Sequence, residues 1–190
     1  SSILLNKKSD FHLIVEIHSN EKNNFQKNLK NIFKKNLAEI IKIENNLKNS
    51  WIWKKREELV HIQKELNYNH KFDISLPLSQ WKNFILKINK FTKKNTQFTS
   101  YFFGHLGDGN LHCNFKVENE LKKDINILSE FIYDLTLSLN GSIAAEHGLG
   151  QKKNMLLKKY KSKEYYDFLK NFKNYLDPKK NLGANKLFKS

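Results

Sequence analysis

A glycine-rich run in the middle of the chain constrains the fold more than any other segment. Over residues 104–112 it reads Gly-His-Leu-Gly-Asp-Gly-Asn-Leu-His. The dipeptide Asp108-Gly109 is typical of a two-residue type I′ turn, in which both central positions take positive φ. Such a turn would close an antiparallel hairpin in which His105 lies directly opposite His112. Directly opposed side chains have Cβ atoms about 4.5–5.5 Å apart, so the two imidazoles could share one metal ion.

Glu146 is the best candidate for a third metal ligand. It lies in a glycine-flanked turn far enough beyond His112 for one helix to cross the sheet and return. Two histidines and one carboxylate, with other positions left open, are a common arrangement for a functional divalent metal. The alternative is that Glu146 only caps a helix that starts near Gly150. Asn114 follows His112 by two positions, so its side chain should point to the same face of the strand.

His147 directly follows Glu146, which suggests a different role for it. In an extended or tightly turned backbone its side chain points away from that of its neighbour, so we expect it beside the metal rather than bound to it. An imidazole has a pKa near neutrality and is suited to act as a general base. A bound cation acidifies the proton of a nearby hydroxyl, and His147 could remove that proton.

Two basic residues are candidate contacts for an anionic substrate. Arg56 is the only arginine among 34 basic side chains, and a guanidinium binds a carboxylate through two parallel hydrogen bonds. An exposed Arg56 paired with Glu57 or Glu58 on a helix is the alternative. Lys71, just ahead of a predicted strand, is either a second anion contact or one more surface lysine.

The net charge of +15 first suggests a nucleic-acid partner. Nucleic-acid sites favour arginine for contacts to bases and phosphates, whereas the basic residues here are almost all lysines scattered over every predicted helix. A solvated, lysine-rich surface is therefore the preferred interpretation, and we expect no nucleic-acid partner.

The composition also bears on the compartment. No apolar run approaches the roughly 20 residues that a membrane span needs, and the start shows no signal peptide. Cys113 is the only cysteine, which excludes an internal disulfide and favours a reducing compartment, either the cytoplasm or the mitochondrial matrix. Because the chain lacks an initial Met and a strand is already predicted from residue 10, we expect it to be part of a longer protein.

Hydrophobic periodicity predicts a single α+β domain with helices packed on one face of a sheet. Alternating apolar residues predict strands, and apolar residues at spacings of three and four predict helices. The predicted strands are 10–18, 71–76, 97–106 and 111–117. The predicted helices are 24–43, 51–66, 78–91, 121–139, and one or two within 152–176, before an irregular tail.

Three segments of the sequence resemble the C-terminal domain of FAD-linked oxidases of the vanillyl-alcohol-oxidase type. They are the hairpin at 104–114, the Gly-Ser-Ile-Ala-Ala-Glu-His-Gly-Leu-Gly run at 141–150, and the Leu-Asp-Pro-Lys ending at 176–179. The chain is most similar to the branch of D-2-hydroxyglutarate dehydrogenase, with D-lactate dehydrogenase and the glycolate oxidase flavin subunit as relatives. The resemblance spans most of the chain from about Trp51 to Lys186.

The resemblance implies a ferredoxin-like antiparallel sheet with helices on one face and a C-terminal helical segment. It further implies that residues 1–190 form the cap, or substrate, domain, and that the FAD-binding domain, absent from this chain, is supplied in cis or in trans. A divalent metal, zinc in the best-known members, would be held by His105, His112 and Glu146. Asn114, Arg56 and Lys71 would contact the substrate, His147 would take its hydroxyl proton, and hydride would pass to FAD.

The expected function is therefore substrate and metal binding within an FAD-dependent D-2-hydroxy-acid dehydrogenase, with an unidentified electron acceptor and an inactive isolated chain. Two departures from the family pattern are relevant. Val60 replaces a threonine that contacts substrate in the 2-hydroxyglutarate branch, and Gly183-Ala184 replaces an Asn-Pro pair. Two alternatives remain: a non-catalytic remnant or split partner-binding module, and a stand-alone metalloenzyme with two histidines and one carboxylate.

Overall fold

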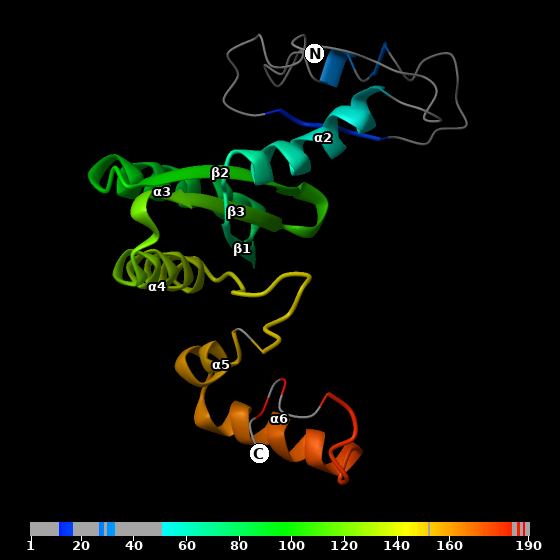
Figure 1. Ribbon diagram of the computed structural model, residues 1–190. Coiled ribbons are helices and arrows are strands. Elements are labelled where there is room, and N and C mark those ends of the chain that lie inside the picture. Colours follow the sequence, from blue (N-terminus) through cyan, green and yellow to red (C-terminus); the bar gives the residue numbers. More distant parts are fainter. Residues whose placement is uncertain are drawn as a thin grey trace. The chain divides into compact units, whose positions relative to one another are not determined.

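The computed structural model describes residues 12–16, 27–28, 30–32, 51–151, 153–183, 186 and 188. Contacts along the chain divide it into two compact units, Ser1–Gln63 and Lys64–Ser190. Each unit is described by itself, and Figure 1 identifies the elements by their labels.

The first unit contains most of helix α2 (Trp51–Glu65), which confirms the prediction of a helix over 51–66. Residues 27–28 and 30–32 are helical, in agreement with the predicted helix at 24–43, whose other residues lie outside the described part. The predicted strand at 10–18 is not formed over residues 12–16, which are exposed and belong to neither a helix nor a strand. Alternation shows only which side chains a strand would bury, and no other described residues pair with this segment.

The second unit is built on a three-stranded antiparallel sheet. Its strands are β1 (His70–Ser75), β2 (Phe98–His105) and β3 (Asn110–Val117), and β3 lies between the other two. Ser142 adds a single antiparallel bridge to Ser75 on the free edge of β1. This is the strand order of a ferredoxin-like fold in which the fourth strand is reduced to one bridge, and it confirms the α+β prediction.

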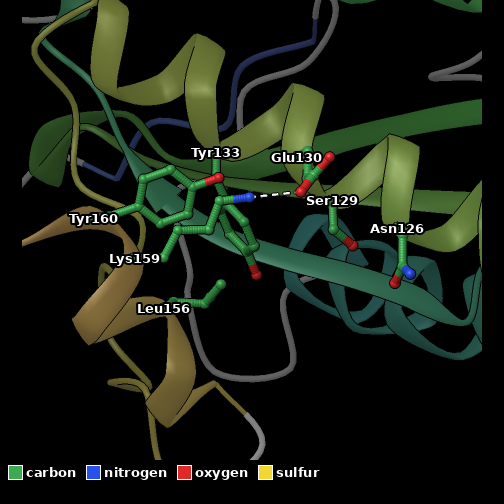
Figure 2. Close-up of a pocket in the computed structure, with 7 residues that line it drawn as sticks. All are labelled: Asn126, Ser129, Glu130, Tyr133, Leu156, Lys159 and Tyr160. Carbon is green, nitrogen blue, oxygen red and sulfur yellow. Dashed lines mark hydrogen bonds and ion pairs between the residues drawn. The ribbon is translucent and has the colours of Figure 1, made fainter.

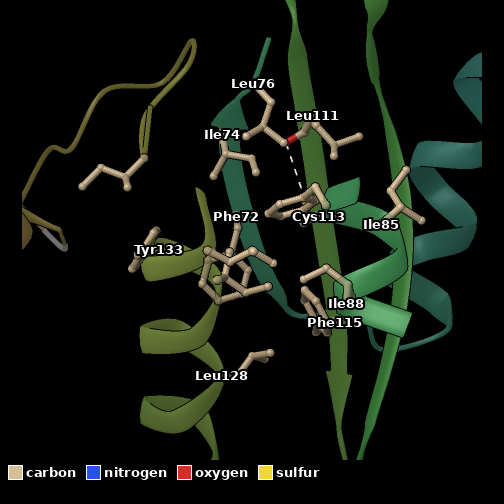
Figure 3. Close-up of a cluster of buried hydrophobic side chains, with 14 of the residues drawn as sticks. Phe72, Ile74, Leu76, Ile85, Ile88, Leu111, Cys113, Phe115, Leu128 and Tyr133 are labelled. Carbon is tan, nitrogen blue, oxygen red and sulfur yellow. Dashed lines mark hydrogen bonds between the residues drawn. The ribbon is translucent and has the colours of Figure 1, made fainter. Parts of the chain in front are cut away.

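Helices α3 (Trp81–Lys94) and α4 (Lys122–Ser138) cover one face of this sheet, and a short 3₁₀ turn, η1 (Leu78–Gln80), leads into α3. Figure 3 shows the apolar side chains that meet there from the strands and both helices. The fully buried members of this core include Ile74, Phe84, Ile88, Leu111, Cys113, Phe115, Leu128 and Ile132. Burial of one such aliphatic or aromatic side chain contributes about 1.5–3 kcal/mol, so the helix stripes and the alternating strand positions stabilise one another.

Two further helices, α5 (Asn154–Tyr160) and α6 (Lys163–Leu176), form the predicted C-terminal helical segment. They are separate because Ser162 leaves the helical conformation and accepts a hydrogen bond from the Tyr165 N–H as the N-cap of α6. After α6, the carboxylate of Asp177 accepts hydrogen bonds from the N–H groups of Asn181 and Leu182. In the described part of the chain no helix is both long and apolar enough to span a bilayer.

The connection between β2 and β3 differs from the predicted two-residue turn. Leu106–Asp108 form a 3₁₀ turn (η2), and only Gly109 takes a positive φ, of 65°. His105 therefore pairs with Asn110, and His112 pairs with Phe103. The prediction that the two histidines are directly opposed is wrong, because a type I′ turn needs positive φ at Asp108 as well.

Two contacts explain why the longer turn is adopted. The Gly109 carbonyl accepts a 2.9 Å hydrogen bond from the Leu76 N–H, which ties the turn to the end of β1. A Cβ on Gly109 would lie 2.7 Å from the Leu76 carbonyl oxygen. The observed register is displaced by two residues from the predicted one, and an even displacement leaves every side chain on its predicted face.

Replacement of Gly109 by Ala should destabilise the protein by about 1–3 kcal/mol, because it forces a side chain into positive φ and against a backbone carbonyl. Gly107→Ala is the matched control, since a Cβ at Gly107 meets no atom within 4 Å. The control should be neutral or slightly stabilising. Urea unfolding of the three proteins measures the difference, and equal midpoints for the two variants would contradict this account of the turn.

Candidate metal and substrate site

The face of the sheet opposite the core carries polar and aromatic side chains. Because successive side chains on a strand alternate between faces, Cys113 points into the core while His112 and Asn114 point away from it. The pairing of the strands arranges nine residues of this face in three rows. The rows are Lys71–Asn114–Tyr101, Asp73–His112–Phe103 and Ser75–Asn110–His105.

Three predicted metal ligands come together at one end of this face. His105 and His112 are diagonal neighbours, with ring centroids 5.7 Å apart and ring planes at 84°. His105 Nε2 lies 3.6 Å from Glu146 Oε1. One donor atom from each of the three residues lies within 4.8 Å of the other two, a geometry that can hold a metal ion. Diagonal placement therefore brings the imidazoles together even though direct opposition is not observed.

The segment after α4 returns along the free edge of β1 and carries Glu146 to the histidines. Ser142 and Ser75 exchange backbone hydrogen bonds of 2.9 and 3.0 Å, and the Ala145 N–H donates to the Asp73 carbonyl at 3.3 Å. Gly141 permits this close approach, because a Cβ there would lie 2.5 Å from the Ser75 carbonyl oxygen. Glu146 therefore reaches the site through backbone pairing and not as the cap of a following helix.

Asp73 is a central residue that the sequence interpretation missed. Only 6% of it is exposed. Its Oδ2 accepts hydrogen bonds from the N–H groups of Glu146 and His147, at 2.9 and 3.0 Å. Its Oδ1 lies 3.3 Å from His112 Nδ1. The one signal in the sequence was its position, because Asp73 is two residues from Lys71 in the same strand and therefore lies on the same face.

Asn110 is a second residue that was missed. It is 1% exposed, and its side-chain amide donates a hydrogen bond to Glu146 Oε1. The predicted turn places Asn110 directly beside it, where a side chain is usually exposed. Nothing in the sequence therefore indicated that Asn110 would be buried against a carboxylate.

His147 lies beside the three candidate ligands, with its ring centroid 6.2 Å from that of His112. Donor atoms of Asp73, Glu146 and His147 also lie within 4.8 Å of one another. The expectation that the side chains of Glu146 and His147 diverge is therefore wrong. Alternation applies to extended strands, whereas the N–H groups of these two residues turn toward the same Asp73 oxygen.

The electrostatics of the site favour neutral His112 and ionised Asp73. Burial, the largest influence, lowers the pKa of His112, and the carboxylates of Asp73 and Glu146 only partly oppose it. Burial raises the pKa of Asp73, but hydrogen bonds from the N–H groups of His147 and Glu146, together with the charges of His112 and His147, bring the net pKa below its usual value. A neutral imidazole is the form that binds a metal ion.

Lys153 brings an ammonium group close to the same carboxylate. It is half-buried, and its pKa is lowered by burial while the charge of Asp73 acts in the opposite direction. Its signal in the sequence is weak, because it is one lysine among many.

Of the other predicted site residues, two lie on the polar face of the sheet and one lies in the first unit. Lys71 is exposed on the polar face, and Asn114, which is 2% exposed, lies next to it in the same row. Arg56 lies on α2, in the first unit.

A separate pocket of about 300 Å³ between α4 and α5 is lined by none of the predicted site residues (Figure 2). The Lys159–Glu130 ion pair, at 2.6 Å, lies at that pocket.

Comparison with known proteins identifies the family. Residues 2–187 match the sequence model of the FAD linked oxidases, C-terminal domain. The chain belongs to this family.

Relatives of this FAD-linked oxidase domain include two proteins named D-2-hydroxyglutarate dehydrogenase. The mitochondrial one of Bos taurus is 33% identical over 128 residues, which cover 67% of this chain and 23% of the relative. That of Stutzerimonas stutzeri is 29% identical over 153 residues, covering 76% and 32%. A mitochondrial protein of Schizosaccharomyces pombe, provisionally named D-lactate dehydrogenase, is 31% identical over 183 residues, covering 88% and 35%. The chain thus spans between about a quarter and a third of the length of these relatives.

In this FAD-linked oxidase domain the buried carboxylate of Asp73 should matter for stability. Asp73→Ala leaves the N–H groups of Glu146 and His147 without their acceptor, at a cost of about 2–4 kcal/mol. Asp73→Asn keeps an oxygen acceptor for both groups and should cost less. Urea unfolding in the presence of a chelator, which removes any contribution from bound metal, tests this order. The reverse order would contradict the role of Oδ2.

Proposed function

We propose that this chain is the substrate- and metal-binding domain of an FAD-dependent D-2-hydroxy-acid dehydrogenase. Such an enzyme oxidises a 2-hydroxy acid to the 2-oxo acid. The observation that supports this most directly is the convergence of His105, His112 and Glu146 donor atoms within 4.8 Å, with His147 beside them. Membership of the FAD-linked oxidase family and the names of its relatives support the reaction class.

His105, His112 and Glu146 would hold a divalent metal ion, and among the common metals zinc best matches these donors. Two imidazole nitrogens and one carboxylate oxygen are a donor set that zinc accepts, and further coordination positions stay open for substrate. His112 turns its Nδ1 toward Asp73, so its Nε2 is the nitrogen available to a metal. When bound, the ion would polarise the oxygens of the substrate.

The remaining residues would bind the substrate and move one proton. Asn114 lies next to His112 on the polar face and would contact the carboxylate or hydroxyl of the substrate. Lys71 would hold a substrate carboxylate, and the ammonium of Lys153 adds positive charge near Asp73. For Arg56 the same role is proposed from the resemblance to the family alone. The imidazole of His147 would accept the hydroxyl proton of the substrate, and FAD, when bound, would supply the oxidising power for the reaction.

Membership of the C-terminal-domain family supports a division of the reaction between two domains. Residues 1–190 form the substrate domain, and FAD is held mainly by a flavin-binding domain, in cis or in trans. An unidentified electron acceptor would complete the reaction. The mitochondrial names of several relatives favour the mitochondrial matrix, with the cytoplasm as the other reducing compartment.

The full chain should bind one equivalent of Zn²⁺ without FAD. His105→Ala and Glu146→Gln should each weaken this binding by more than about 100-fold, because loss of a direct ligand exceeds the 10–100-fold cost of losing an outer residue. His61→Ala, which removes an exposed histidine on α2, is the control. Competition with a chromophoric chelator measures the affinities, and equal binding by all four proteins would rule out this ligand set.

His147→Ala should reduce turnover of the flavin-loaded enzyme by about 10²–10⁴-fold, the usual contribution of a general base. Its zinc content should stay unchanged, because His147 lies outside the ligand set. Dye reduction with D-2-hydroxyglutarate and with D-lactate, alongside metal analysis, measures both, and His61→Ala again serves as the control. Unchanged turnover would remove His147 from the mechanism. Turnover by the chain in the absence of any flavin would instead favour a stand-alone metalloenzyme.

A further inference from the structure

We infer that Asp73 is the positioning residue of the metal centre. It fixes the proton of His112 on Nδ1, so that Nε2 is free for the metal, and it anchors the backbone that presents Glu146 and His147. This inference rests on the proposed metal site, but part of it can be tested without any metal.

The first part follows from the surroundings of Asp73 Oδ1. The Asp73 side chain is 9% exposed, and among the described residues Oδ1 has no hydrogen-bond donor of normal geometry. His112 Nδ1 is 3.3 Å away, and the His112 side chain is itself 14% exposed. A buried carboxylate oxygen is stabilised by a donor, and the imidazole can supply one only if its proton is on Nδ1.

Strand pairing explains why this contact forms. Asp73 and His112 are partners in the β1–β3 ladder, so their side chains leave the same face directly opposite one another. On the other side of His112, the ring of Phe103 lies 4.7 Å away between centroids. The imidazole is therefore confined between a carboxylate and an aromatic ring. With Nδ1 turned toward Asp73, Nε2 is the nitrogen left for the cluster that His112 forms with His105 and Glu146.

The second part follows from Asp73 Oδ2. It accepts hydrogen bonds from two successive N–H groups, those of Glu146 and His147, and the Asp73 carbonyl accepts a third from Ala145. One residue of β1 thus holds both the third candidate ligand and the candidate base. A carboxylate that orients a ligating histidine is a recurrent feature of metal sites, and its loss typically weakens metal binding 10–100-fold.

Asp73→Asn separates positioning from folding. The amide oxygen can replace Oδ2 as the acceptor for both N–H groups, which leaves the amide nitrogen facing His112 Nδ1. This nitrogen donates, so His112 must accept at Nδ1 and carry its proton on Nε2. The nitrogen meant for the metal is then blocked, although the shape of the side chain is almost unchanged.

The experiment uses the ¹⁵N-labelled chain of residues 1–190, with Asp124→Asn as a control that removes the same charge from α4. Histidine ¹⁵N shifts in the metal-free proteins report the tautomer of His112. We expect the proton on Nδ1 in the parent and in Asp124→Asn, and on Nε2 in Asp73→Asn. Zn²⁺ affinity should fall 10–100-fold only in Asp73→Asn.

Hydrogen exchange tests the anchor separately. The amides of Glu146 and His147 should exchange faster in Asp73→Ala than in Asp73→Asn, because only Ala removes the acceptor. Equal exchange in the two variants would overturn the anchoring role.

The outcomes separate this inference from the proposed function. Zn²⁺ binding by the parent that depends on His105 and Glu146, with no loss in Asp73→Asn, would overturn the positioning role and leave the metal site standing. A tautomer change in Asp73→Asn without Zn²⁺ binding by the parent would support the positioning of His112 and overturn the metal proposal. Should Asp73→Asn fail to fold, a parent His112 protonated on Nε2 would still refute the inference.

Discussion

The central strand β3 is hydrogen-bonded on both sides, and this double pairing determines where the candidate site residues carried by the three strands lie. Its odd-numbered residues, such as Cys113, enter the core beneath α3 and α4, and its even-numbered residues, such as His112, face the other way. Because β1 and β2 follow the same alternation, the core that stabilises the sheet also orients the polar face. The chemistry therefore depends on register, and a displacement by one residue would bury the imidazoles and expose the core.

The alternation of odd- and even-numbered residues between the two faces of the sheet explains how much could be predicted from the sequence. The hairpin, its two arms and the common face of His105 and His112 follow from local alternation and from the glycines. The turn could not be predicted, because Asp108-Gly109 suits more than one tight turn. The choice is made by the hydrogen bond from Leu76, a residue outside the hairpin. The predicted register was wrong by two residues, which does not change the face on which each side chain lies. The predicted convergence of the two histidines is therefore still found.

Asp73 and Asn110 show what a local interpretation of the sequence misses. Both occupy alternating strand positions that a single strand would expose to solvent, and both are buried. They are covered by the segment that contains Glu146, which is distant in sequence and reaches them through the bridge between Ser75 and Ser142. Neither hydrophobic periodicity nor the choice of turn residues predicts that this segment comes back to the edge of β1. A buried polar residue needs a partner, but only the folded chain identifies the partner.

The charge balance of the polar face gives a physical reason for a cation there. Asp73 and Glu146 bring two carboxylates close to one another, and the half-buried ammonium of Lys153 is one opposing charge near Asp73. The pKa of His112 is lowered, so its ring does not supply a compensating positive charge at neutral pH. A buried carboxylate such as that of Asp73 is stabilised by pairing or by a nearby cation, whereas Glu146 is exposed. A divalent ion among His105, His112 and Glu146 would supply that positive charge where the neutral imidazole nitrogens can bind it. The burial that lowers the pKa of His112 would then favour metal binding at this site as well.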